Sequence, residues 1–118
     1  MVTLTIADLL AKKCRPLDTE STPAEISAGL ALLDRWQKID GCIVRQFDFR
    51  NYTETLAFVN AIAVVIHAED HHPELVVTYN RCVVKFHTHS VNQGRGGISE
   101  NDFICAAKID AIFLQSPV

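Results

Sequence analysis

The sequence lacks the charge pattern of a nucleic-acid-binding protein. It contains 11 lysine and arginine residues against 14 aspartate and glutamate residues, which gives a net charge of −3 with no basic cluster. Binding to DNA or RNA requires a basic patch or stripe that neutralises phosphates. We therefore expect no direct nucleic-acid partner.

The sequence also lacks a segment that could enter or cross a membrane. The longest apolar run, 56–66, is interrupted by Asn60, and a membrane-spanning helix needs about 20 predominantly apolar residues. The N-terminal segment has neither the basic region nor the long apolar region of a secretory signal. We expect a soluble, cytoplasmic protein with no membrane partner.

Cysteine is sparse and never closely paired. Cys14, Cys42, Cys82 and Cys105 include no C-x-x-C spacing, which excludes the patterns of zinc ribbons and thioredoxin-like motifs. Reduced, buried thiols are the expected state in a cytosolic protein. A length of 118 residues with 48% hydrophobic content suits one domain with a sizeable core, so 1–118 is expected to be a single domain.

The first half of the chain contains a helix start signal followed by a strand pattern. Thr22, Pro23 and Glu25 stand in the order of an N-cap, a first-turn proline and a reciprocal capping carboxylate, so a helix should begin there. Between residues 39 and 50 apolar and polar residues mostly alternate, with Arg45 as the exception, and the strands are expected within residues 36–50. This alternation is typical of one or two strands.

The segment 51–70 predicts a long helix that is apolar nearly all the way round. Such a helix needs cover on more than one side, and in so small a domain part of that cover can come from a second subunit. Pro73 disfavours helical geometry at His72, which predicts the end of the helix near Asp70 or His71. We expect an oligomer whose contacts cover Leu56, Phe58, Val59, Ile62 and Val65.

The second half predicts a β-hairpin, a loop and a last helix. Runs 75–79 and 81–89 contain strand formers on either side of a turn, and alternation in the second run places His87 and His89 together on the face away from the core. Three of the five glycines lie in 90–98, which predicts a mobile loop. Ser99 and Asp102 form a capping-box pattern. The apolar face of the following helix is expected to contain Ile104, Ala107, Ala111 and Leu114.

This order of elements favours an α+β fold, with an antiparallel sheet covered by helices on one face. The sequence shows no internal repeat and no low-complexity segment.

All five histidines lie between His67 and His89. Imidazole titrates near neutral pH, so such a cluster indicates proton transfer, metal ligation or a pH switch. His67 and His71 have the spacing of one helix turn, but the intervening glutamate is out of place for the H-E-x-x-H zinc motif. Alternation directs Cys82 away from His87 and His89. Acid–base catalysis fits better, because eliminating water needs one group that removes a proton and another that protonates the leaving hydroxyl.

The histidine pattern resembles the signature of the pterin-4a-carbinolamine dehydratases. It consists of His67, the sequence HHP at 71–73, Tyr79, His89 and Asp102. The stretches NYTETLAFVNAIAVVIHAEDHHPELVVTYNRCVVKFHTHS and ISENDFICAAKID are similar to the same family. The resemblance covers roughly residues 20–115, which leaves 1–20 as an N-terminal extension partly outside it.

The resemblance implies an α+β fold with a four-stranded antiparallel sheet and three helices packed on one face, assembled into homodimers or homotetramers. It implies a hydro-lyase, 4a-hydroxytetrahydrobiopterin dehydratase, which eliminates water from pterin-4a-carbinolamine to give quinonoid dihydropterin in tetrahydrobiopterin recycling. The resemblance also implies that neither a metal nor a cofactor takes part. The catalytic residues carried over are His71, His72 and His89. The residues expected to bind the pterin substrate are His67, Pro73 and Asp102.

Some residues keep two interpretations. His67 stands where many family members carry glutamate, and the loop 90–98 is a few residues longer than usual. His87 lies outside the family pattern and is expected to be solvent-exposed. Asp102 either caps the last helix or contacts the ligand, and Tyr79 either packs or binds.

Two other functions stay open. One is a non-catalytic dimerisation cofactor, which would associate through the apolar helix. The other is a His-rich metal-binding protein, whose ligands would be His67, His71, His87 and His89.

Overall fold

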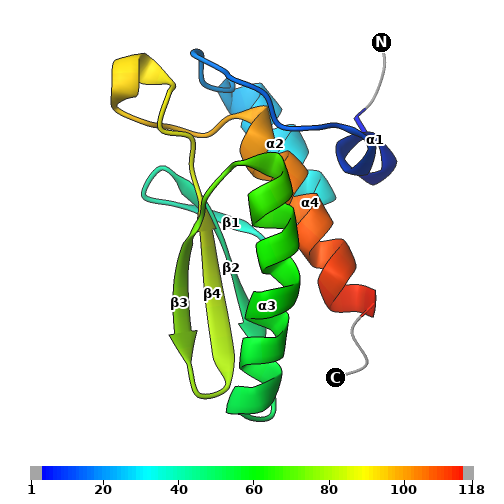
Figure 1. Ribbon diagram of the computed structural model, residues 1–118. Helices are drawn as coiled ribbons and strands as arrows, with labels where there is room; N and C mark the ends of the chain where they lie inside the picture. Colours follow the sequence, from blue (N-terminus) through cyan, green and yellow to red (C-terminus); the bar gives the residue numbers. More distant parts are fainter. Residues whose placement is uncertain (1–3, 116–118) are drawn as a thin grey trace.

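Within residues 4–115, which the computed structural model describes, four strands form one sheet and helices cover one of its faces (Figure 1). The helices are α1 (Ile6–Ala11), α2 (Pro23–Leu32), α3 (Tyr52–Glu69) and α4 (Glu100–Gln115). The strands are β1 (Gln37–Ile39), β2 (Cys42–Asp48), β3 (Glu74–Thr78) and β4 (Arg81–Phe86), and a 3₁₀ turn, η1, spans Asn92–Gly94. This arrangement confirms the predicted α+β class and its four-stranded antiparallel sheet.

The sheet has the strand order β1-β2-β4-β3, and each neighbouring pair is antiparallel. β3 and β4 form the predicted hairpin, and β2 lies along the other side of β4 with Ile43 opposite Phe86. Because β4 is paired on both sides, the chain that leaves its end starts from a fixed position. The buried residues on the helix-covered face include Ile43, Phe47, Cys82, Val84 and Phe86.

Arg45, the exception to the alternation of β2, lies on the same side of the strand as Ile43 and Phe47. Its guanidinium is 2.7 Å from the carboxylate of Asp110 in α4, and that carboxylate also accepts a hydrogen bond of 2.9 Å from the Trp36 indole. The Arg45 guanidinium carbon lies 4.3 Å from the centroid of the Phe47 ring. A charged residue is tolerated among apolar ones because it is paired and stacked on an aromatic face.

The helix starts and ends follow the capping signals. The Thr22 side chain and Glu25 form both halves of the predicted capping box of α2. The Asn51 side chain caps α3 by accepting from the Glu54 amide at 2.9 Å. At its other end α3 stops at Glu69, and the C-cap residue Asp70 takes a left-handed φ of 50°.

The exposed side of α3 differs in part from the predicted one. Phe58 and Ile62 are buried in the protein's own core, because that side of the helix packs on the sheet and on α4. The large apolar residues of α3 that face solvent include Leu56, as predicted, and Val64, which is 69% exposed. Cover from a second subunit would therefore fall on this other side of the helix.

Three further features differ from the sequence expectations. α1 is an additional helix in the N-terminal extension, begun by a capping box between Thr5 and Asp8. β4 ends at Phe86 and not at His89, because the Thr88 backbone pairs outside the sheet with Gly97. Leu114 is 82% exposed, because Ile112 and Phe113 take the core-facing positions of the last turn of α4. Among residues 4–115 no helix is long and apolar enough to cross a membrane.

Candidate active site

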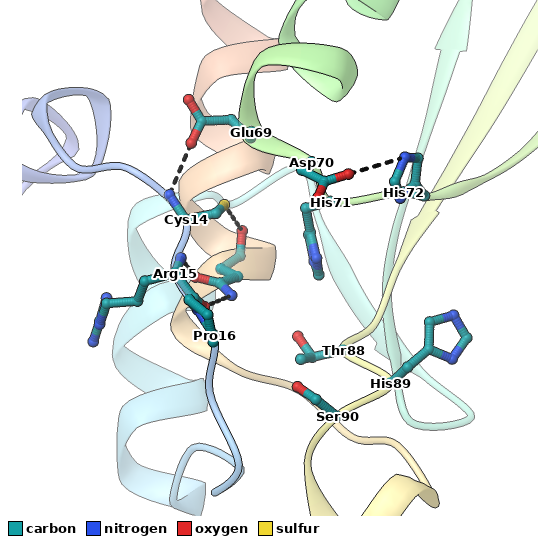
Figure 2. Close-up of a pocket in the computed structure, with 11 residues that line it drawn as sticks. Cys14, Arg15, Pro16, Glu69, Asp70, His71, His72, Thr88, His89 and Ser90 are labelled. Atoms are coloured by element: carbon teal, nitrogen blue, oxygen red, sulfur yellow. Dashed lines mark hydrogen bonds and ion pairs between the residues drawn. The ribbon is translucent and has the colours of Figure 1, made fainter.

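A cavity of about 380 Å³ lies where the start of β3 and the end of β4 are side by side (Figure 2). Antiparallel pairing sets Glu74 opposite Lys85, so residues that precede β3 lie beside residues that follow β4. This brings His71 and His72 to the same place as His89. The other residues that line the cavity are Cys14, Arg15, Pro16, Glu69, Asp70, Thr88, Ser90 and Asn101.

His71 is the most enclosed of the three histidines, with a side chain only 11% exposed. Its Nε2 lies 2.6 Å from Oδ1 of Asp102. Its ring stacks on Phe86 with centroids 5.6 Å apart and planes inclined by 4°. A carboxylate accepts a hydrogen bond from a protonated Nε2. Asp102 therefore fixes the tautomer, and Nδ1 is the nitrogen of His71 that can accept or release a proton.

Asp102 is fully buried, and both of its carboxylate oxygens are satisfied. Oδ2 accepts from the Ser99 amide at 2.9 Å and from the Thr88 hydroxyl at 3.1 Å. The Ser99 contact is the carboxylate half of the predicted capping box. The first turn of a helix also favours negative charge through the helix dipole. Asp102 thus caps α4 and at the same time orients His71.

His72 lies at the rim of the cavity, and its side chain is 69% exposed. Its Nε2 is 3.7 Å from Asp70 Oδ1, which is too long for a hydrogen bond. The left-handed backbone at Asp70 turns the chain sharply after α3. The adjacent side chains of His71 and His72 diverge, as Figure 2 shows.

His89 is exposed at the side of the cavity formed by the chain that leaves β4. Its ring contacts that of His87, with centroids 4.4 Å apart, which confirms that the two histidines share a face. The prediction that His87 is solvent-exposed is wrong: it is half-buried. The loop packs against it so closely at Gly96 that a Cβ there would lie 3.2 Å from His87 Cδ2.

The structure does not place His67 or Pro73 among the residues that line the cavity. His67 is exposed in the last turn of α3. The expected helical alignment of His67 with His71, four residues later, does not form, because α3 ends at Glu69. Pro73 is half-buried directly before β3, and Tyr79 is exposed at the far end of the hairpin.

Several residues of the cavity wall were not predicted from the sequence. Thr88 carried a signal, since it is a polar residue at a core-facing position of the strand pattern. Asn101 and residues 14–16 carried none, because their hydrogen bonds join positions 86 residues apart. Only the folded chain brings them together.

No three histidine, cysteine, aspartate or glutamate side chains within residues 4–115 converge as ligands of one metal ion. The four thiols are free, but Cys14 and Cys42 are only partly buried, contrary to the expectation for all four. The contact with Cys14, with 3.4 Å between the sulfur atoms, and burial raise the pKa of Cys105. Burial raises the pKa of Cys82 to about 11. Cys82 and Cys105 are therefore unreactive thiols at neutral pH.

Together these features define a small α+β protein with one cavity lined by His71, His72 and His89. The chain belongs to the pterin 4 alpha carbinolamine dehydratase family, whose model matches residues 19–112. It is 63% identical to a candidate pterin-4-alpha-carbinolamine dehydratase of Bdellovibrio bacteriovorus, over 89% of this chain and 88% of that protein. A candidate enzyme of the same name from Nitrosospira multiformis is 47% identical, over 92% and 96% of the two chains.

Solved structures show the same fold. The transcriptional coactivator/pterin dehydratase of Brucella melitensis superposes with a TM-score of 0.72 at 35% identity, over 80% of this chain and 98% of that chain. A pterin dehydratase-like protein described as a RuBisCO assembly factor in the alpha-carboxysome has a TM-score of 0.55 at 22% identity, over 70% and 90% of the two chains. The second likeness concerns the fold alone.

Proposed function

We propose that the protein is a hydro-lyase that dehydrates a 4a-hydroxytetrahydropterin to the quinonoid dihydropterin, as in tetrahydrobiopterin recycling. The proposal rests on one observation. His71, which is held by the buried Asp102, and His89 line the same cavity. The cavity volume of about 380 Å³ is in the range of small-molecule sites. Family membership supports a pterin as the ligand.

The reaction needs one proton delivered and one removed. The hydroxyl on C4a takes up a proton, the C4a–O bond breaks and water leaves. A base removes the proton from N5, and the electron pair of that N–H bond completes the double bond between N5 and C4a. Positioned acids and bases typically contribute about 10²–10⁴ each to such a step.

His71 supplies the acid in the proposed mechanism. When protonated, its imidazolium lies against the Asp102 carboxylate, which stabilises the cation while Nδ1 donates to the departing hydroxyl. After the transfer, Asp102 keeps the remaining proton on Nε2, so Nδ1 is free to be protonated again. Asp102 therefore acts on the substrate through His71.

His89 is the proposed base and His72 the proposed orienting group. His89 is exposed, so it can pass the N5 proton on to water after each turnover. His72, at the rim, contacts the pterin ring without a fixed partner of its own. Pro73 takes part indirectly, because it holds the extended chain that begins β3. His67 has no place in the proposed site.

We further assign the protein to the cytoplasm as a homo-oligomer that associates through the exposed side of α3. Leu56 and Val64 are exposed on α3, whose opposite side packs in the core through Phe58 and Ile62. Exposed apolar groups on one face favour contact with a second copy. The same surface favours a second candidate function, a non-catalytic role as a protein partner, and the Brucella relative is described as a coactivator as well as a pterin dehydratase.

A direct dehydration assay tests the enzymatic proposal. 4a-Hydroxytetrahydrobiopterin is generated in the cuvette, and its loss of water is followed by absorbance with and without the purified protein. The protein should accelerate the reaction well above the spontaneous rate. A rate equal to the spontaneous one would contradict the proposal and leave the partner role as the better candidate.

A further inference from the structure

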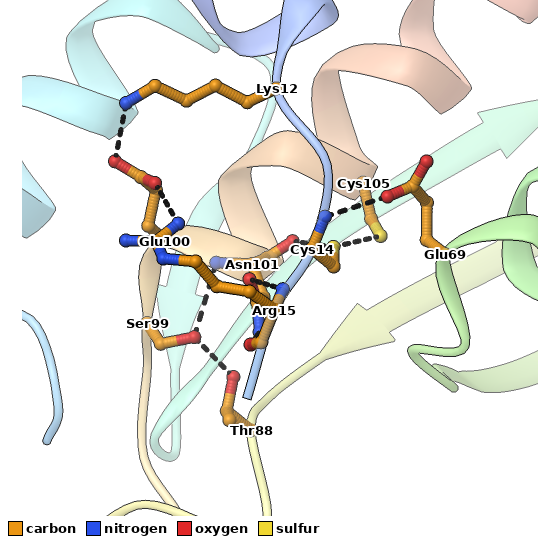
Figure 3. Close-up of polar contacts among 9 residues, drawn as sticks. All are labelled: Lys12, Cys14, Arg15, Glu69, Thr88, Ser99, Glu100, Asn101 and Cys105. Carbon is orange, nitrogen blue, oxygen red and sulfur yellow. Dashed lines mark hydrogen bonds and ion pairs between the residues drawn. The ribbon is translucent and has the colours of Figure 1, made fainter. Parts of the chain in front are cut away.

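The N-terminal strap (residues 12–17) forms one wall of the cavity, although it precedes the segment matched by the family model. It runs from the end of α1 across the first turn of α4 (Figures 1 and 3). Cys14, Arg15 and Pro16 line the cavity together with His71 and His89. The strap therefore lies where a bound ligand would touch it.

The Asn101 side chain holds the backbone of the strap. The Arg15 amide donates to Asn101 Oδ1 at 3.1 Å, and Asn101 Nδ2 donates to the Arg15 carbonyl at 2.6 Å. One side-chain amide thus satisfies both backbone groups of one residue, as a paired strand would. Asn101 is buried in the first turn of α4, directly before Asp102, so one helix turn fixes both the strap and His71.

Glu69 holds the strap from the other side. Its Oε1 accepts from the Cys14 amide at 2.8 Å, and its Oε2 is 2.8 Å from the Lys108 ammonium. Glu69 is the last residue of α3, two positions before His71. The strap is consequently attached next to both partners of the His71–Asp102 pair.

The side-chain contacts of the strap with Glu100 are of another kind. Lys12 and Arg15 reach the Glu100 carboxylate at 3.0 Å and 2.7 Å, and both basic side chains are about half-exposed. Exposed ion pairs of this kind contribute little. Figure 2 shows the Arg15 side chain pointing away from the cavity, so its backbone is what faces the site. Glu100 therefore touches the same strap without facing the cavity.

We infer that the strap is a positioning element for the reduced pterin, held against the ligand by Asn101 and Glu69; this inference rests on the proposed function. Backbone groups fixed by buried partners present a rigid wall, and a rigid wall lowers the ordering cost of binding. Asn101 and Glu69 also line the cavity, but their side-chain polar atoms bond to the strap and to Lys108. Both are therefore positioning residues that act through the strap. Loosening them should weaken binding and leave the acid–base step intact.

The test compares Asn101→Ala with Glu100→Gln. Asn101→Ala should raise KM for the carbinolamine, and Kd for the unreactive 7,8-dihydrobiopterin, about tenfold, the effect of losing one or two ordering hydrogen bonds. Its kcat should stay within about twofold of wild type, which identifies lost binding and not lost chemistry. Glu100→Gln should leave both constants within about twofold, since it removes only exposed ion pairs.

Hydrogen exchange supplies a readout that does not need activity. In the wild-type protein the Cys14 and Arg15 amides should exchange more slowly once 7,8-dihydrobiopterin is bound, and Asn101→Ala should abolish this protection. If Asn101→Ala does not fold, Asn101→Asp replaces it. Asn101→Asp keeps the acceptor for the Arg15 amide but sets a carboxylate against the Arg15 carbonyl, so the same rise in KM is expected.

Two outcomes overturn the inference, and they differ. If wild-type protein turns over the carbinolamine while Asn101→Ala exchanges faster with an unchanged KM, the strap is structural only and the proposed function stands. If wild-type protein neither turns over the carbinolamine nor binds 7,8-dihydrobiopterin, the proposed function fails and the strap inference fails with it.

Discussion

His71 Nε2 and Asp102 Oδ1 lie 2.6 Å apart although 31 residues separate them in the chain. The β3–β4 hairpin and the start of α4 bring them together. Because Asp102 also accepts from the Ser99 amide, the same carboxylate caps a helix and orients a candidate catalytic histidine. Loss of the Asp102 carboxylate should affect both the stability of the fold and the dehydration rate, and the two effects can be measured separately.

Asp102→Asn keeps the size of the side chain and removes its charge. It should lower kcat for dehydration about 10- to 100-fold, because the imidazolium of His71 loses its counter-ion. It should also lower the free energy of unfolding by about 1–3 kcal/mol, the cost of disturbing buried hydrogen bonds. Steady-state assays and urea unfolding measure the two effects.

Ser99→Ala is the matched control. The Ser99 hydroxyl accepts from the Asn101 amide and contacts Thr88, but it does not touch His71. This variant should lose stability and keep kcat. Asp102→Asn with a normal kcat would show that the carboxylate serves the helix alone.

His89→Ala should lower kcat without unfolding the protein. His89 is exposed, so its truncation removes little buried apolar surface. The free energy of unfolding should therefore change by about 0.5 kcal/mol or less. Loss of a positioned base should cost about 10²-fold or more in rate. His67→Ala, an exposed histidine outside the cavity, should leave the rate unchanged. Equal rates in the two variants would remove His89 from the mechanism.

Much of the fold follows from local signals. The Thr22 capping box and the helix end before Pro73 are set by residues within a few positions of one another, and both are found as predicted. The exposed side of α3 could not be assigned in the same way. Which of its apolar residues is buried depends on where the sheet and α4 lie, and the periodicity of a helix that is apolar nearly all round does not reveal this.

The site was partly predictable for the same reason. Hairpin pairing alone brings His71 and His72 close to His89, and a hairpin was predicted. The pterin-binding role of His67 was implied by the family resemblance, and its helical alignment with His71 does not form because α3 ends at Glu69. The strap has no sequence signal, since the bonds of Asn101 to Arg15 are made only in the folded chain.

Glu69 should contribute a pH-dependent part of the stability. Burial alone raises the pKa of Glu69, but the hydrogen bonds from Lys108 and from the Cys14 amide, with nearby positive charge, outweigh burial and lower the pKa. A pKa lower in the folded than in the unfolded state stabilises the protein above the ordinary glutamate value of about 4.3. This stabilisation is lost as the pH falls through the lowered value.

Glu69→Gln should therefore show a shallower loss of stability than wild type between about pH 5 and pH 3. Urea unfolding at a series of pH values measures this slope. Glu74→Gln, at an exposed position of β3, is the control and should follow the wild-type curve. Identical slopes for Glu69→Gln and wild type would contradict the role of the Glu69 contacts.

Val64→Glu should weaken self-association. Val64 is 69% exposed on α3, and a charge there would oppose contact between apolar surfaces. Light scattering at micromolar concentration should report an oligomer for wild type and a smaller species for the variant. Ala28→Glu, which adds the same charge to an exposed position of α2, should leave the mass unchanged. A monomeric wild-type protein would refute the proposed association.

The dehydration rate of metal-depleted protein tests the metal-independent acid–base mechanism most directly. Wild-type protein and the His71→Ala/His89→Ala double variant are dialysed against a strong chelator, and each is assayed with 4a-hydroxytetrahydrobiopterin. The mechanism predicts that wild-type protein keeps its full rate and that the double variant falls by at least about 10²-fold. A wild-type rate lost on chelation and restored by zinc, or normal turnover in the double variant, would contradict it.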